Sequence, residues 1–146
     1  MAWQRTPTRV VFLVLVTGLM GLGCGGESGP ARFPITGKVT FAGQPVKFGT
    51  IQFDPDKGND GPQGFAEIRD GVFDTAKGGL GTIRGKIVAK INGYESAPAS
   101  GNPDESPPTL FVNYQVHFEM TDKPMTKDFD VPKQASENKA DPAAGP

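Results

Sequence analysis

Apolar and polar residues alternate with a period of two along most of the chain between residues 34 and 131. In the longest case, from Leu110 to Met120, an apolar residue occupies every second position. This alternation is expected of strands that bury one face and expose the other. The pattern predicts seven strands, over residues 35–41, 46–53, 65–69, 72–75, 84–92, 110–120 and 128–131.

Turn residues separate these segments. The chain has 20 glycines and 14 prolines in 146 residues, which favours short strands and tight turns over helices. The dipeptide Asp70-Gly71 suits a two-residue hairpin turn. We therefore expect an all-β domain over residues 34–132, built as an antiparallel seven-stranded β-sandwich. The polar, alanine-rich segment 133–146 is expected to be disordered.

The second strand departs from strict alternation. Val46 and Phe48 share one face of the strand, whereas Ile51 and Phe53 share the other. One extra residue around positions 49–50 would bring all four onto the same face, so we expect a β-bulge there.

The first 23 residues are typical of a signal peptide. Two arginines and no acidic residue precede position 10, and thirteen uncharged residues, 10–22, follow. An apolar segment of that length suits an export signal and is shorter than the roughly 20 residues of a membrane-spanning helix. The expected organisation is a signal peptide over 1–23 and a flexible tether over 24–33.

Cys24 is the only cysteine and directly follows Leu22-Gly23. This segment resembles the lipobox of bacterial lipoproteins, although Gly21 stands where that pattern prefers leucine. The resemblance implies that Cys24 is the lipidated first residue of the mature chain and anchors it to a membrane of the cell envelope. The alternative is a signal peptide cut elsewhere, which leaves Cys24 as an incidental thiol.

The charge of the mature chain argues against nucleic acid as a partner. Residues 1–23 contain two of the 15 basic residues and none of the 16 acidic ones, so residues 24–146 carry 13 basic and 16 acidic side chains. A net charge of −3 with no basic stripe does not suit a phosphate backbone.

Three segments resemble the carboxypeptidase regulatory-like (transthyretin-like) domain family. Residues 34–46, Pro-Ile-Thr-Gly-Lys-Val-Thr-Phe-Ala-Gly-Gln-Pro-Val, are similar to its opening hairpin. The apolar-x-aromatic-x-Pro step at 51–55 and the glycine-containing strand at 81–89 continue the similarity, while Arg69-Asp70-Gly71 replaces the family's usual middle turn. The resemblance implies a β-sandwich in a small bacterial lipoprotein, and such modules are mostly appendages rather than catalysts.

His117, the only histidine, lies on the polar face of its predicted strand, so we expect a solvated side chain. No serine stands in a Gly-x-Ser-x-Gly motif, and no second histidine or cysteine completes a zinc site. We therefore assign no catalytic residues and no cofactor, and expect a protein that is not an enzyme.

The densest cluster of oxygen ligands lies between residues 54 and 61. Calcium binds six to eight oxygens, and the candidate ligands here are Asp54, Asp56, Asn59 and Asp60. The alternation of ligands fails at Gly58, and the same residue types are common in surface turns. The segment is consistent both with a calcium site and with an ordinary polar turn.

Two aromatic residues are candidates for ligand binding. Strict alternation places Phe111 on the outer face of its strand, and Tyr94 lies in a predicted loop. Some β-sandwiches stack such rings on sugars, although Trp3, the only tryptophan, lies in the signal peptide. The expected function is a membrane-anchored structural or interaction module that contacts envelope proteins or polysaccharide. A carbohydrate-binding module and an accessory subunit of an envelope transport or secretion complex are the alternatives.

Overall fold

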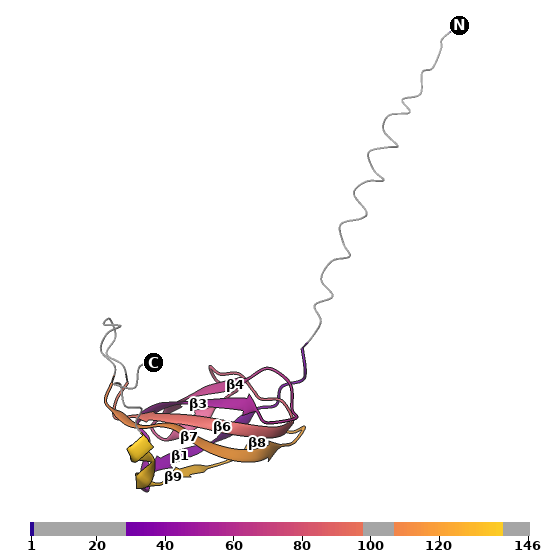
Figure 1. The fold of residues 1–146 in the computed structure, drawn as a ribbon. Helices are drawn as coiled ribbons and strands as arrows, with labels where there is room; N and C mark the ends of the chain where they lie inside the picture. The colour runs from indigo at the N-terminus through magenta and orange to yellow at the C-terminus, as the bar shows by residue number, and fades with distance from the viewer. Residues whose placement is uncertain (2–28, 98–106, 139–146) are drawn as a thin grey trace, which may run out of the picture.

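The computed structural model describes residues 1, 29–97 and 107–138, and within them the chain is all-β with no α-helix. All seven predicted strands are present, together with two strands of two residues each (Figure 1). The strands are β1 (Ile35–Phe41), β2 (Gln44–Pro45), β3 (Phe48–Pro55), β4 (Gly64–Arg69), β5 (Val72–Asp74), β6 (Gly85–Tyr94), β7 (Thr109–Met120), β8 (Met125–Thr126) and β9 (Phe129–Val131). The predicted signal peptide, Cys24 and the end of the tail at 139–146 lie outside the described residues.

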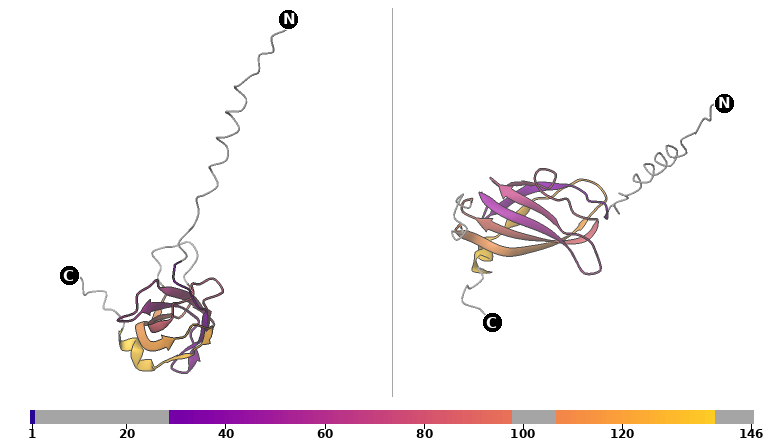
Figure 2. Two further views of the ribbon diagram at one scale, coloured as in Figure 1. Left: turned by 90° about the vertical axis from the view of Figure 1, so that its right-hand side faces the viewer. Right: turned by 90° about the horizontal axis from the view of Figure 1, so that it is seen from above.

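The strands form one continuous sheet in the order β2-β1-β5-β4-β3-β6-β7. Neighbours along this path are antiparallel, while β8 and β9 pair with β1 in parallel. The sheet curls into a half-barrel, which is clearest in the end-on view of Figure 2. The all-β prediction is therefore confirmed, whereas the division into the two separate sheets of a sandwich is not.

The core fills the inside of the curl. Phe53 of β3 and Phe73 of β5 lie side by side with ring centroids 6.0 Å apart, and Phe73 meets Phe129 of β9 at 5.9 Å. Phe118 of β7 packs edge-on against Phe53 at 6.2 Å. These contacts connect β7, at one end of the sheet, with β9, which pairs with β1 near the other end. We infer that the aromatic cluster holds the half-barrel curled.

The predicted turn at Asp70-Gly71 is confirmed. Asp70 and Gly71 both have positive φ, +49° and +78°, and the flanking residues Arg69 and Val72 pair directly. This is the geometry of a type I′ hairpin, whose twist matches that of the two strands it joins.

The bulge predicted at positions 49–50 is wrong. β3 pairs in unbroken register with both β4 and β6 from Phe48 onward. Val46 lies before the strand, where its N–H donates to the carbonyl of Val39 and its side chain is fully buried. Gly49 takes the inward position beside Asn92, where a side chain would overlap the Asn92 carbonyl.

A bulge occurs instead in β7. Tyr114 pairs with Ile91 and Phe111 pairs with Gly93, so three steps on β7 match two steps on β6. Asn113 is the extra residue and has a φ of +51°. Its backbone N–H donates to the side-chain Oδ1 of Asn92 at 2.8 Å. The bulge turns Phe111 inward.

The ordered domain is wider than the predicted 34–132. Arg32 donates from Nη1 to the carbonyls of Gln63 and Gly81 at 2.8 and 2.7 Å, and Phe33 forms a β-bridge with Thr82. Beyond β9, a 3₁₀ helix occupies Lys133–Asn138, the segment expected to begin the disordered tail. Its Ala135 is buried in the core cluster.

The half-barrel is open along one side, between β7 and β9, which no ladder joins in the part of the chain that the structure describes. We call this opening the seam. Lys127 lies there, with its ammonium 5.4 Å from the ring centroid of Phe118 and 5.7 Å from that of Phe129. The lysine thus covers the exposed edge of the aromatic cluster through two cation–π contacts.

Candidate functional site

A groove of about 820 Å³ lies on the outer face of the half-barrel, across β1, β4, β5 and β8. We call it the outer groove. It is lined by Thr36, Gly37, Lys38, Glu67, Arg69, Val72, Phe73, Asp74, Lys77, Gly78, Thr126 and Asp128. The volume is within the range of ligand sites in proteins.

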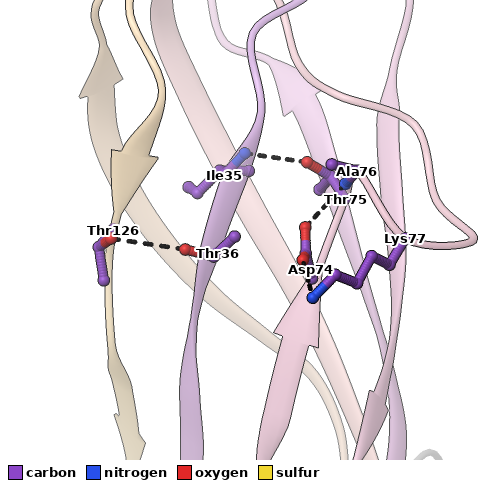
Figure 3. Close-up of polar contacts among 7 residues, drawn as sticks. All are labelled: Ile35, Thr36, Asp74, Thr75, Ala76, Lys77 and Thr126. Atoms are coloured by element: carbon purple, nitrogen blue, oxygen red, sulfur yellow. Dashed lines mark hydrogen bonds and ion pairs between the residues drawn. The ribbon is translucent and has the colours of Figure 1, made fainter.

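The alternation of β1 and β5 places the polar lining. Gly37 and Phe73 face the core, so their neighbours Thr36 and Asp74 face outward. Asp74 then closes the turn that follows β5, because its Oδ1 accepts the N–H of Ala76 at 2.9 Å (Figure 3). Lys77 returns to Asp74 Oδ2 at 3.5 Å, which forms one wall of the groove.

The opposite wall comes from β8 and from Asp128, which directly precedes β9. The hydroxyls of Thr36 and Thr126 are 3.4 Å apart, a long separation for a hydroxyl bond (Figure 3). Asp128 accepts the backbone N–H of Lys38 at 2.8 Å. Both threonines therefore retain most of their capacity to bond a ligand.

A row of side chains continues the outer groove across the sheet. Arg69 of β4 pairs with Val72 of β5 on one side and with Phe48 of β3 on the other. Phe48 pairs in turn with Tyr94 of β6, and Val72 pairs with Lys38 of β1. We call Lys38, Val72, Arg69, Phe48 and Tyr94 the cross-strand row. Phe48 and Arg69 were missed by sequence reasoning, which contained no information on register.

The exposed apolar side chains gather on the same face. Among the described residues after Met1, the large apolar side chains that are most exposed are Phe65 at 36%, Val72 at 53% and Leu80 at 55%. Val72 lies in the outer groove, and Phe65 and Leu80 form a β-bridge close by. Val72 therefore brings exposed apolar surface into the groove itself, whereas Phe65 and Leu80 lie outside its lining.

The outward placement predicted for Phe111 is wrong. Its side chain is fully buried and stacks on Phe41 with centroids 5.2 Å apart. Tyr94 is not in a loop but is the last residue of β6, half-buried beside Phe48 at 6.1 Å. Of the two aromatic candidates, only Tyr94 is placed where a ligand can reach it.

Three of the four calcium candidates bond to other parts of the protein. Asp54 is buried and pairs with the Lys90 ammonium at 2.7 Å, while Asn59 donates its amide N–H groups to backbone carbonyls at positions 84 and 86. Asp56 bonds His117, and Asp60 lines a separate hollow beside residues 30–33. No group of three or more potential metal ligands occurs within the described residues.

His117 is exposed on the outer face, as predicted, and has a partner that the sequence did not indicate. Its Nδ1 lies 2.8 Å from Asp56 Oδ2 and links β7 to the loop after β3. The hydrogen bond from His117, followed by one from the backbone N–H of Lys57, lowers the pKa of Asp56 below its ordinary 3.8.

We expect His117→Asn to raise the pKa of Asp56 toward 3.8, because the variant loses the largest cause of the shift. A folded pKa below the unfolded one means that the contact stabilises the protein above about pH 3.8 and that this contribution disappears as the pH falls through the folded pKa. An NMR titration of the Asp56 carboxyl carbon measures the change. Gln115→Asn on the same strand is the control, and an unchanged Asp56 pKa in His117→Asn would contradict the prediction.

Comparison with known proteins returned no matching family model, curated protein or solved structure. None of the helices that the structure describes is long and apolar enough to cross a membrane. The features of the molecule that point to a function are therefore the outer groove, the cross-strand row and the sequence before residue 29.

Proposed function

We propose that this protein is a lipid-anchored, non-catalytic binding module of the bacterial cell envelope, which contacts its partner through the outer groove. The observation that carries the proposal is the groove itself, about 820 Å³ in volume and lined by apolar, hydroxyl and charged side chains. Its acidic groups are bonded within the fold, Glu67 to Arg69 and Asp74 to Lys77, which suits a binding surface better than proton transfer.

The distance from Cys24 to the domain supports anchoring close to a membrane. Arg32 is fixed to Gln63 and Gly81, and it follows Cys24 by eight residues. Eight extended residues reach at most about 29 Å. A diacylglyceryl group with an N-acyl chain on Cys24 gives stable attachment, whereas one chain alone is marginal. The outer groove is then presented within a short distance of the bilayer.

We also propose that the half-barrel belongs with the carboxypeptidase regulatory-like domains. The opening motif at 34–46 coincides with β1, the following turn and β2, and the step at 51–55 coincides with the end of β3. The positions of these strands support the proposal. If the domain belongs to this family, the curled sheet is a form of the family's β-sandwich.

Anchoring is tested by the intact mass of the protein extracted from bacterial membranes, with Cys24→Ser as the control. We expect a mass equal to residues 24–146 plus a diacylglyceryl and an N-acyl group, and loss of both the lipid and the membrane fraction in Cys24→Ser. A mass that shows cleavage elsewhere and no lipid would contradict the proposal.

The role of the outer groove is tested by photo-cross-linking in intact cells. A photoreactive amino acid in place of Val72, an exposed residue of the groove lining, should capture the partner, while the same amino acid in place of Lys123, outside the groove, should not. One stoichiometric protein partner would favour an accessory subunit of an envelope complex. Equal labelling from both positions would contradict a role for the groove.

A further inference from the structure

The charge balance of the outer groove limits what it can hold. Its lining has three basic and three acidic side chains, so its formal charge is zero. The basic ones are Lys38, Arg69 and Lys77, and the acidic ones are Glu67, Asp74 and Asp128. A polyanion or a polycation would meet as much repulsion as attraction in such a groove. A chain of hydroxyl groups, each of which both donates and accepts, can bond to side chains of either sign.

Hydrogen-bonding capacity remains on the lining after the internal contacts are satisfied. Arg69 donates from Nε and Nη2 to one oxygen of Glu67, at 3.1 and 2.6 Å. A guanidinium has five N–H groups, so the others are left for a ligand. The hydroxyls of Thr36 and Thr126, held 3.4 Å apart, add two groups that donate or accept.

Apolar and aromatic surface lies beside these polar groups. The guanidinium of Arg69 is 5.4 Å from the ring centroid of Phe48, and Phe48 is 6.1 Å from Tyr94. Val72, with 53% of its surface exposed, continues the row on the other side of Arg69. With strands about 4.8 Å apart, the five strands that carry the row span about 19 Å. That length suits an extended oligomer rather than a single small molecule.

We propose that the outer groove and the cross-strand row bind an extended, uncharged polysaccharide, an inference that rests on the proposed function of the groove. The sugar hydroxyls hydrogen-bond to Arg69, Thr36 and Thr126. The C–H faces of the sugar rings pack on Val72 and on the rings of Phe48 and Tyr94. The polysaccharide lies across the strands, because the row that it follows crosses them.

Calorimetry on the full chain tests this. The protein is purified from membranes in a sugar-free zwitterionic detergent and titrated with cellohexaose, chitohexaose and maltohexaose. We expect at least one of these neutral hexasaccharides to bind. Its Kd should change less than about twofold between low and high salt, because no ion pair forms with the ligand.

Substitutions in the row locate the site. Phe48→Leu and Tyr94→Leu keep apolar volume but remove a ring, and each should weaken binding about three- to tenfold. Arg69→Gln should weaken binding about tenfold through loss of charged donors. Phe65→Leu is the matched control, since Phe65 is an exposed ring on the same strand as Arg69 but outside the row. Circular dichroism confirms that each variant is folded.

Three results would overturn the inference. The first is no binding of any of the three hexasaccharides at millimolar concentration. The second is tighter, salt-sensitive binding of hexagalacturonate or hexaglutamate, which would show a charged ligand. The third is equal loss of affinity in Phe65→Leu and Phe48→Leu. In each case the proposed function would still stand if Cys24 carries lipid and the groove cross-links to a protein. Failure of the polysaccharide inference can therefore be distinguished from failure of the proposed function.

Discussion

Replacement of Phe73 by alanine is expected to destabilise the protein by about 3–5 kcal/mol. Phe73 is 1% exposed and lies between Phe53 and Phe129, so its removal leaves a cavity where β5 and β9 meet across β1. Since small domains have a total stability of about 5–15 kcal/mol, the loss is a large part of the whole. Urea unfolding should show a lower midpoint with an unchanged slope, and the melting temperature should fall by roughly 15–30 °C.

Phe65→Ala is the control for Phe73→Ala. Phe65 has the same side chain but is 36% exposed on the outer face of β4, so its loss should cost less than about 1 kcal/mol. A Phe73→Ala variant that unfolds at the same urea concentration as Phe65→Ala would show that the aromatic cluster does not hold the sheet curled.

Gly37→Ala is expected to destabilise the protein by about 3 kcal/mol, at the upper end of the usual cost of overpacking. A Cβ at this position would overlap the backbone carbonyl of Lys127 and touch the ring of Phe73. β1 cannot move aside, because it is paired with β5 on one edge and with β8 and β9 on the other. Thermal unfolding followed by circular dichroism measures the effect, which should be a fall in melting temperature of roughly 10–20 °C.

Gly93→Ala is a useful comparison with Gly37→Ala, because the added Cβ meets a side chain instead of the backbone. At Gly93 the Cβ would overlap the ring of Phe111, a side chain that a second substitution can shorten. Phe111→Leu should therefore partly rescue Gly93→Ala in a double-mutant cycle. No side-chain change removes a backbone carbonyl, so Lys127→Ala should not rescue Gly37→Ala. Rescue there would mean that the clash is with the side chain of Lys127.

Most of the strands could be predicted because their pattern is local. The alternation in β1, β4 and β6 and the turn at Asp70-Gly71 are visible in the sequence, and each is present in the structure. The β7 bulge was missed because Asn113 carries no local signal: the apolar residues on both sides of it continue the alternation. Only pairing with β6 shows that three steps match two, and this shift decides whether Phe111 lies in the core or on the surface.

The outer groove could not be predicted for a related reason. Its residues come from four strands and two turns, and the sequence states neither strand order nor register. Arg69 is brought between Phe48 and Val72 by two independent ladders, although Phe48 is 21 positions earlier in the chain. The calcium candidates show the opposite case. They are close in sequence, but the strand and turn geometry directs Asp54 and Asp56 to Lys90 and His117.

The lysine at the seam has a consequence for copies of this protein that are crowded on one surface. β7 is twelve residues long, and on the side away from β6 it pairs with no strand among the described residues, although the 3₁₀ helix at Lys133–Asn138 packs against it. Unpaired strand edges are where neighbouring molecules can join. A strand added there would have to displace the Lys127 ammonium from the rings of Phe118 and Phe129 or enclose it without water. We therefore expect that neutralisation of Lys127, for example by acetylation, would lower the cost of adding a strand at the seam.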